Sequence, residues 1–229
     1  MSHLHIPDGI LPLPLLLAGF VLMVLGLLVT LPATRRQGPR QLAFQSALAG
    51  LMLAVMAIPV PVTAFDYCMT LAGPVGVLLG AASAFQACVI VTLILALMGQ
   101  GGFTVIGLNA IVLGLGAVLA RPLYRAAHAL GRSEPWAMAF ATAASQLLSS
   151  ALWIALLWES VRLSPIAAGH HEVLESLRVL RGGTVTLVVV VLMVVAVLVE
   201  SLLGYGLARF LARVRPDLLP DGRRLPEEG

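Results

Sequence analysis

The sequence predicts an all-α integral membrane protein with about seven transmembrane helices, and two observations carry that prediction. First, 59% of the 229 residues are hydrophobic and 11% are charged, whereas soluble domains carry roughly 25% charged residues. Second, the hydrophobic residues gather in long runs, and backbone groups in lipid must be hydrogen-bonded within helices. All 14 basic residues are arginines. Because they lie mostly between the runs, we interpret them as determinants of membrane orientation rather than as a nucleic-acid surface.

The first run, residues 12–33, sets the expected orientation. No basic residue precedes it, and Arg35, Arg36 and Arg40 follow it. Arginines favour the cytoplasmic side of a membrane, so we expect the N-terminus outside. We also expect the first helix to be retained, because the sequence lacks the basic start of a signal peptide.

The other apolar runs cover 42–58, 70–98, 103–120, 135–158 and 183–209. Six spans in total would place the arginines of 121–132 and of the C-terminus outside, against the positive-inside rule. Glycines interrupt the long run 70–98, and a break near 80–83 gives a short Gly-rich helix near 70–81 followed by a full helix. Seven spans then put both arginine groups in the cytoplasm.

This count divides the chain into three parts. We expect an external N-terminal arm over 1–11, a single transmembrane helical domain over 12–212, and a disordered cytoplasmic tail over 213–229. The loops 59–69 and 159–182 then lie outside with the arm.

The interior of the runs offers little catalytic chemistry. No Walker A, HExxH or GxSxG motif occurs, so we expect neither an enzyme nor ATP hydrolysis by this chain. Glu200 is the one carboxylate well inside an apolar run. Intramembrane carboxylates can serve proton relays, but we interpret Glu200 as a helix-end residue near the cytoplasmic face.

Small residues recur at helical spacing at Gly76, Gly80 and Ala84, and again at Gly116 and Ala120. Such series let helices approach closely in lipid. They indicate either internal packing or a docking face for another membrane subunit, and we favour internal packing.

Metal-ligating groups gather on the expected outer side. Segment 59–70 contains Asp66 and Cys68, and His3 and His5 lie on the same side. Imidazole, carboxylate and thiol groups could therefore meet at one external mouth. The structural alternatives are a loop cap for Asp66 and a small buried apolar residue for Cys68.

The N-terminus carries the strongest metal signal. An amine, backbone amides and an imidazole can hold a metal in one plane, as Ni(II) and Cu(II) prefer. If Met1 is retained, its amine and His3 supply this set; if Met1 is removed, Ser2 and His3 supply it with one further ligand. Pro7 and the Asp-Gly turn after it stiffen the arm, which favours a fixed site over a solvated tail.

Three segments together resemble the CbiM/NikM family, the substrate-capture membrane subunits of energy-coupling-factor transporters for cobalt and nickel. They are HIPDGILP at 5–12, TLAGPVGVLLGAASAFQA at 70–87 and GQGGFTVIGLNAIVLGLGA at 99–117. The resemblance implies a seven-helix fold with an external N-terminus. It also implies a metal site made of the N-terminal amine, an adjacent amide, an N-terminal histidine and a histidine in the loop before the short third span.

The matching motifs place the family's metal ligands at positions of this sequence, and some of the residues there differ. His5 matches the N-terminal histidine, but Ser2, His3 and Leu4 stand between it and the usual start. Either His3 takes the amine-adjacent role or both histidines bind. Cys68 stands where the loop histidine is expected, and sulfur favours softer ions such as Zn(II) or Cu(I) while still accepting Ni(II) and Co(II). The predicted ligand set is Met1, Ser2, His3, His5, Asp66 and Cys68.

The resemblance implies that the chain captures cobalt or nickel, with zinc left open, at the outer face of the cell membrane. A transmembrane coupling subunit and a pair of cytoplasmic ATPases on other chains would drive import, and no cofactor beyond the transported ion is expected. Two alternatives stay open: a self-sufficient multipass metal carrier, for zinc for example, and a membrane metal sensor. Gln100 replaces a histidine usual in the family.

A second group of potential ligands lies in the loop after the sixth run. It consists of His170, His171, Glu172 and Glu175. This group is either an accessory metal-collecting patch or the solvated start of a short helix, and we favour the solvated helix start.

Overall fold

The computed structural model describes residues 11–35, 37–58, 60–62, 65–100, 102–163 and 183–220. Within these ranges the chain forms seven α-helices, one two-stranded hairpin and one 3-10 turn. The helices are α1 (Leu13–Thr34), α2 (Pro39–Met56), α3 (Ala72–Leu79), α4 (Ala81–Leu97), α5 (Ile106–Ala129), α6 (Glu134–Leu163) and α8 (Gly183–Val214). The hairpin is β1 (Val60–Val62) with β2 (Phe65–Tyr67), and the turn is η1 (Pro216–Leu218).

The helical fold class is confirmed, as is the break in the long run 70–98. α3 ends at Leu79 and α4 begins at Ala81, with Gly80 between them at φ +79° and ψ 170°. This backbone conformation is open essentially only to glycine, which explains why the run divides there. In the described part of the chain, four helices are long and apolar enough to cross a membrane: α1, α5, 134–156 of α6 and 190–214 of α8. The protein is therefore a multi-pass membrane protein.

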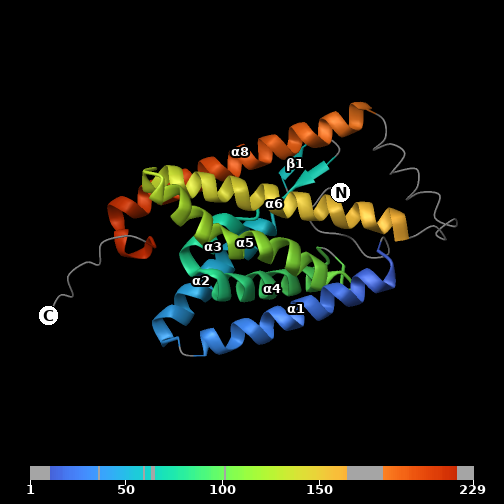
Figure 1. Cartoon of the computed structure of the whole chain (residues 1–229), viewed down its shortest axis with the longest axis horizontal. Coiled ribbons are helices and arrows are strands. Elements are labelled where there is room, and N and C mark those ends of the chain that lie inside the picture. Colours follow the sequence, from blue (N-terminus) through green and yellow to red (C-terminus); the bar gives the residue numbers. More distant parts are fainter. Residues whose placement is uncertain are drawn as a thin grey trace.

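The helices run back and forth along one direction, which gives the bundle two ends (Figure 1). At one end, the hairpin end, α1, α5 and α8 begin and α6 finishes. The opposite end holds the α1–α2 connection, the α5–α6 turn and η1. We call it the arginine end because Arg35, Arg40, Arg125, Arg132, Arg209, Arg213 and Arg215 lie at or near these connections. This grouping is what the positive-inside argument requires, and the side of the membrane that each end faces stays a prediction.

α3 is a largely enclosed helix in the described part of the chain. Seven of its eight residues are buried, and it packs against both α5 and α6. A Cβ at Gly76 would overlap the backbone carbonyl of Ala117 in α5, and a Cβ at Gly73 would lie 2.7 Å from Cα of Thr142 in α6. Gly76 therefore serves close internal packing, as the small-residue pattern predicted.

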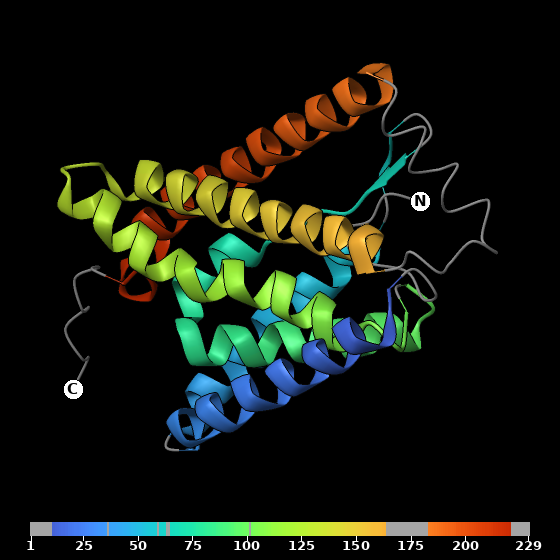
Figure 2. The same ribbon diagram turned by 45° about the vertical axis from the view of Figure 1, so that its right-hand side comes forward.

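α1 lies at the periphery of the bundle (Figure 2). Of its residues only Gly19 and Thr34 are buried. It meets α5 where a Cβ at Gly107 would lie 2.5 Å from the backbone nitrogen of Phe20. Its exposed large side chains are leucines and valines, which suits contact with lipid.

The hairpin adds a feature that the sequence pattern did not predict, since 59–69 was expected to be a plain loop. Its strands pair antiparallel, with Val60 opposite Tyr67 and Val62 opposite Phe65. Valine and aromatic residues favour extended backbone. The hairpin carries the chain from α2 to α3 and places Cys68 directly after β2.

Candidate functional site

The candidate site lies at the hairpin end, where Cys68 connects β2 to α3. The Cys68 side chain is only 4% exposed. Cys88, inside α4, is fully buried, and neither cysteine forms a disulfide. Burial fits the structural alternative for Cys68, and it also fits a ligand held in a fixed position beneath the surface.

The other predicted ligands fall largely outside the described residues. Met1, Ser2, His3 and His5 lie before the first described residue, and His170, His171, Glu172 and Glu175 lie in 164–182. The backbone of Asp66 pairs with Pro61 in the hairpin, while its side chain is not described. Among the residues that the structure does describe, no group of three or more histidine, cysteine or acidic side chains could hold a metal. The ligand set therefore stays a prediction.

The N-terminal arm enters the bundle at Leu11, the first described residue. Leu11 is 7% exposed and packs with Val105 and Leu108 at the start of α5. Trp153 and Leu156 of α6 pack against the same cluster. These contacts lie at the hairpin end (Figure 1), so the arm joins the bundle at the end where Cys68 lies.

Glu200 is the residue that the sequence interpretation misplaced. It lies in the middle of α8, is 1% exposed, and accepts a hydrogen bond from the backbone N–H of Thr70 at 2.8 Å. Its second carboxylate oxygen lies 3.0 Å from the Thr70 hydroxyl. The interpretation of Glu200 as a helix-end residue near the cytoplasmic face is wrong, because the carboxylate faces the protein interior and binds the segment after Cys68.

A third polar side chain completes this cluster. The side-chain oxygen of Gln146, from α6, lies 3.2 Å from the Thr70 hydroxyl, and Gln146 is 4% exposed. A hydroxyl has one proton to donate, and the shorter contact assigns it to Glu200. The cluster thus joins α8, α6 and the start of α3 through buried polar groups. The presence of a carboxylate inside an apolar run was the signal that could have found it.

Gln100 has a packing role. Its side-chain amide donates a hydrogen bond to the carbonyl of Ala57 at 3.1 Å. Ala57 caps the end of α2 and Gln100 follows α4, so this bond ties two helix ends together at the hairpin end. A glutamine can make this bond without taking part in metal binding.

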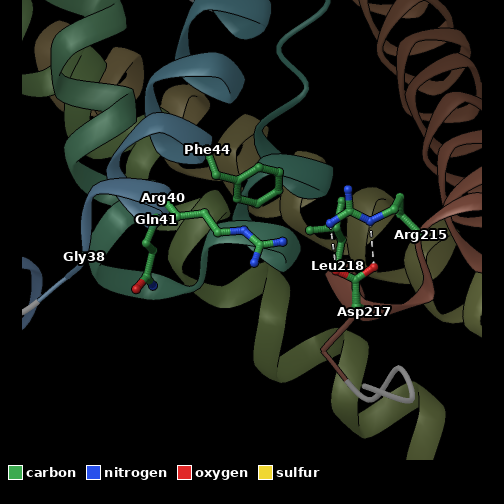
Figure 3. Close-up of a pocket in the computed structure, with 7 residues that line it drawn as sticks. All are labelled: Gly38, Arg40, Gln41, Phe44, Arg215, Asp217 and Leu218. Atoms are coloured by element: carbon green, nitrogen blue, oxygen red, sulfur yellow. Dashed lines mark hydrogen bonds and ion pairs between the residues drawn. The ribbon is translucent and has the colours of Figure 1, made fainter. Parts of the chain in front are cut away.

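The arginine end carries a separate cavity of about 690 Å³ between the start of α2 and the segment after α8 (Figure 3). Arg215 donates two hydrogen bonds of 2.8 Å to the carboxylate of Asp217, and the Arg40 guanidinium points into the same space. The hydrogen bond from Arg215 lowers the pKa of Asp217. This cavity has one carboxylate and no soft ligand, and it lies at the opposite end from Cys68.

Comparison with known proteins relates the whole chain to one family. Residues 5–218 match the CbiM family, described as the cobalt uptake substrate-specific transmembrane region. A Haemophilus influenzae protein named as a metal transport protein is 36% identical over 123 residues, which cover 53% of this chain and 58% of that protein. The chain thus matches less than two thirds of that relative's length.

A solved structure described as a truncated transition metal transporter shares the fold. It superposes with a TM-score of 0.67 and 17% identity, covering 91% of this chain and 98% of that one. The family match spans all of the described helices, and the structural match covers nearly the same length. The chain belongs to the CbiM family.

Proposed function

We propose that this chain is the capture component of a multi-subunit importer for a divalent transition metal, cobalt or nickel. The observation that carries the proposal is the match to the cobalt uptake family over 5–218, which includes His5. The structure supports it by joining the N-terminal arm to the bundle at the end where Cys68 follows the hairpin. The ion would bind between the arm and the 59–70 segment.

In this proposal the arm supplies most of the ligands. The amine of Met1, or of Ser2 after removal of Met1, would bind together with His3 and His5. Amine and imidazole nitrogens suit Ni(II) and Co(II). Cys68 would add a thiolate, and the Asp66 carboxylate is available as a further oxygen ligand.

The release step belongs to other chains in this proposal. The sequence holds no Walker A motif. A pair of cytoplasmic ATPases, acting through a transmembrane coupling subunit, would therefore supply the energy for release of the ion into the cell. The proposed orientation puts the hairpin end outside the cell membrane and the arginine end in the cytoplasm, in agreement with the positive-inside rule.

The first test removes both histidines of the arm. Purified His3→Ala/His5→Ala protein, titrated calorimetrically with Ni(II), Co(II), Zn(II) and Cu(II), should lose high-affinity binding. Cells that carry the variant should lose metal uptake while still inserting the protein. Intact-mass measurement of the N-terminus would show which amine is free.

His128→Ala is the matched control. His128 lies on α5 near the arginine end, and its ring nitrogen contacts the carbonyl of Arg132 at 3.0 Å. Its removal should leave metal binding unchanged. Full binding and uptake by the double variant would refute the site assignment.

The second test concerns the identity of the metal. Replacing the thiol by an imidazole in Cys68→His should shift preference toward nickel or cobalt over zinc, because imidazole is a harder ligand than thiolate. Competition titrations measure the shift. Unchanged selectivity would show that Cys68 is not a ligand.

The self-sufficient carrier is the alternative that this proposal must exclude. The purified chain in liposomes, without nucleotide or partner subunits, should bind metal but not transport it. Sustained metal entry in that system would favour the carrier.

A further inference from the structure

We propose that Glu200 is a positioning residue for Cys68: its buried carboxylate fixes the Cys68–Leu71 segment and so holds the thiol in place at the hairpin end. The inference rests on the proposed function in so far as it treats Cys68 as a metal ligand. Glu200 itself would not touch the metal.

The first step is the anchor itself. Glu200 reaches Thr70 across 130 positions of sequence and accepts both its backbone N–H, at 2.8 Å, and its hydroxyl, at 3.0 Å. Both residues are 1% exposed, so water does not compete for these bonds. Hydrogen bonds are stronger in a buried, low-dielectric environment than in water, and a backbone N–H bond fixes the main chain as well as the side chain.

The second step is the turn that the anchor supports. Leu71 has φ +52° and ψ 14°, in the left-handed region, which is disfavoured for a residue with a side chain. Thr70 holds this turn from both sides: its N–H binds Glu200, and its hydroxyl oxygen accepts the N–H of Ala72 at 3.3 Å. Among the described non-glycine residues Leu71 alone has positive φ. The strained turn at Leu71 therefore directly follows Thr70, the residue that Glu200 binds.

The third step connects the anchor to the thiol. Cys68 precedes Thr70 by two residues, so their Cα atoms lie within about 7 Å of each other. A metal ligand must be placed to about 0.2 Å for good coordination. Residues that orient ligands typically contribute 10–100-fold to metal affinity, and loss of the Thr70 anchor would release the segment that carries the thiol.

The first experiment tests positioning without metal. In a Cys88→Ala background, Cys68 is the one remaining cysteine of the sequence, and a maleimide reports how often its buried thiol is exposed. Glu200→Ala should react about tenfold faster, because the two buried hydrogen bonds from Thr70 are lost. Ser201→Ala is the control, since that hydroxyl binds only the Val197 carbonyl of its own helix, and its rate should match the parent.

The second experiment tests the effect on the metal. Co(II) bound by a thiolate has a charge-transfer absorption band in the near ultraviolet. Glu200→Gln keeps the side-chain volume and one acceptor oxygen, and it should weaken this band and lower Co(II) affinity by about 10–100-fold. Thr70→Val should do the same, and the Glu200→Gln/Thr70→Val double variant should lose less than the sum of the two, as expected for residues in one network.

The outcomes separate this inference from the proposed function. Circular dichroism and monodisperse elution would first establish that each variant is folded. Parental alkylation rates and parental cobalt binding in both Glu200 variants would overturn the inference. Faster alkylation in Glu200→Ala, with no thiolate band in the parent protein, would support the positioning role while overturning Cys68 as a ligand.

Discussion

The two parts of the proposed site are attached to very different helices. The N-terminal arm continues into α1, which buries only two of its 22 residues, whereas Cys68 continues into α3, which buries seven of its eight residues. α1 is 22 residues long and apolar throughout; α3 is too short to cross a membrane. One part of the site is therefore carried by a lipid-facing helix, and the other by the centre of the bundle.

This difference indicates where the molecule is sensitive to change. A short helix inside a membrane protein is stable only if its neighbours surround it, and α3 achieves this through backbone contact at Gly73 and Gly76 and through the Thr70–Glu200 anchor at its start. α1 needs no such precision on its outer face, because lipid adapts to side-chain shape. We therefore expect substitutions in α3 to lower both stability and metal affinity, and substitutions on the outer face of α1 to change neither.

The largest effect should come from Gly76→Leu. The new side chain would collide with the backbone carbonyl of Ala117, and overpacking of this kind costs about 3 kcal/mol. Detergent-mediated unfolding measures the loss, and cobalt titration should show weaker binding. Gly206→Leu on α8 is the control, since no atom lies within 4 Å of a Cβ there. Equal losses in the two variants would contradict the enclosed position of α3.

A smaller loss should follow from Gly80→Ala at the end of α3. The φ of +79° and ψ of 170° are strained for alanine by about 2 kcal/mol, and the added Cβ would lie 2.6 Å from a guanidinium nitrogen of Arg121. Gly99→Ala shares the φ of +79° but has open space around it. We therefore expect the larger loss of unfolding free energy in Gly80→Ala, because the crowding by Arg121 and the ψ of 170° add to the positive φ. Equal losses in the two variants would contradict an added cost at Gly80.

Much of the helical architecture could be predicted from the sequence. Hydropathy located the long helices, and the arginine pattern required an odd number of spans. Gly80 then marked where the run 70–98 divides. Hydropathy, arginine placement and a single glycine depend on the local sequence or on a count along the chain. They can therefore be interpreted without knowing which helices are in contact.

The buried cluster could not be predicted in the same way. Glu200 and Thr70 are 130 positions apart, and an isolated carboxylate in an apolar run shows neither its partner nor its depth. The hairpin was missed because each of its strands has only three residues, too few for a reliable pattern. For the site, residue types indicated Cys68 and the arm, and the structure describes only Cys68 and the point at which the arm enters.

The smallest effect should come from Val29→Ala on α1. Val29 is 77% exposed, so its side chain loses almost no protein contact when it is shortened, and we expect a change within about 0.5 kcal/mol in unfolding free energy. Cobalt affinity should stay at the parental value, because the arm joins the bundle through Leu11 rather than through the outer face of α1. A clear loss of affinity in a variant of unchanged stability would mean that a partner or a second copy covers this face during capture. The contrast between α1 and α3 would then describe only the isolated chain.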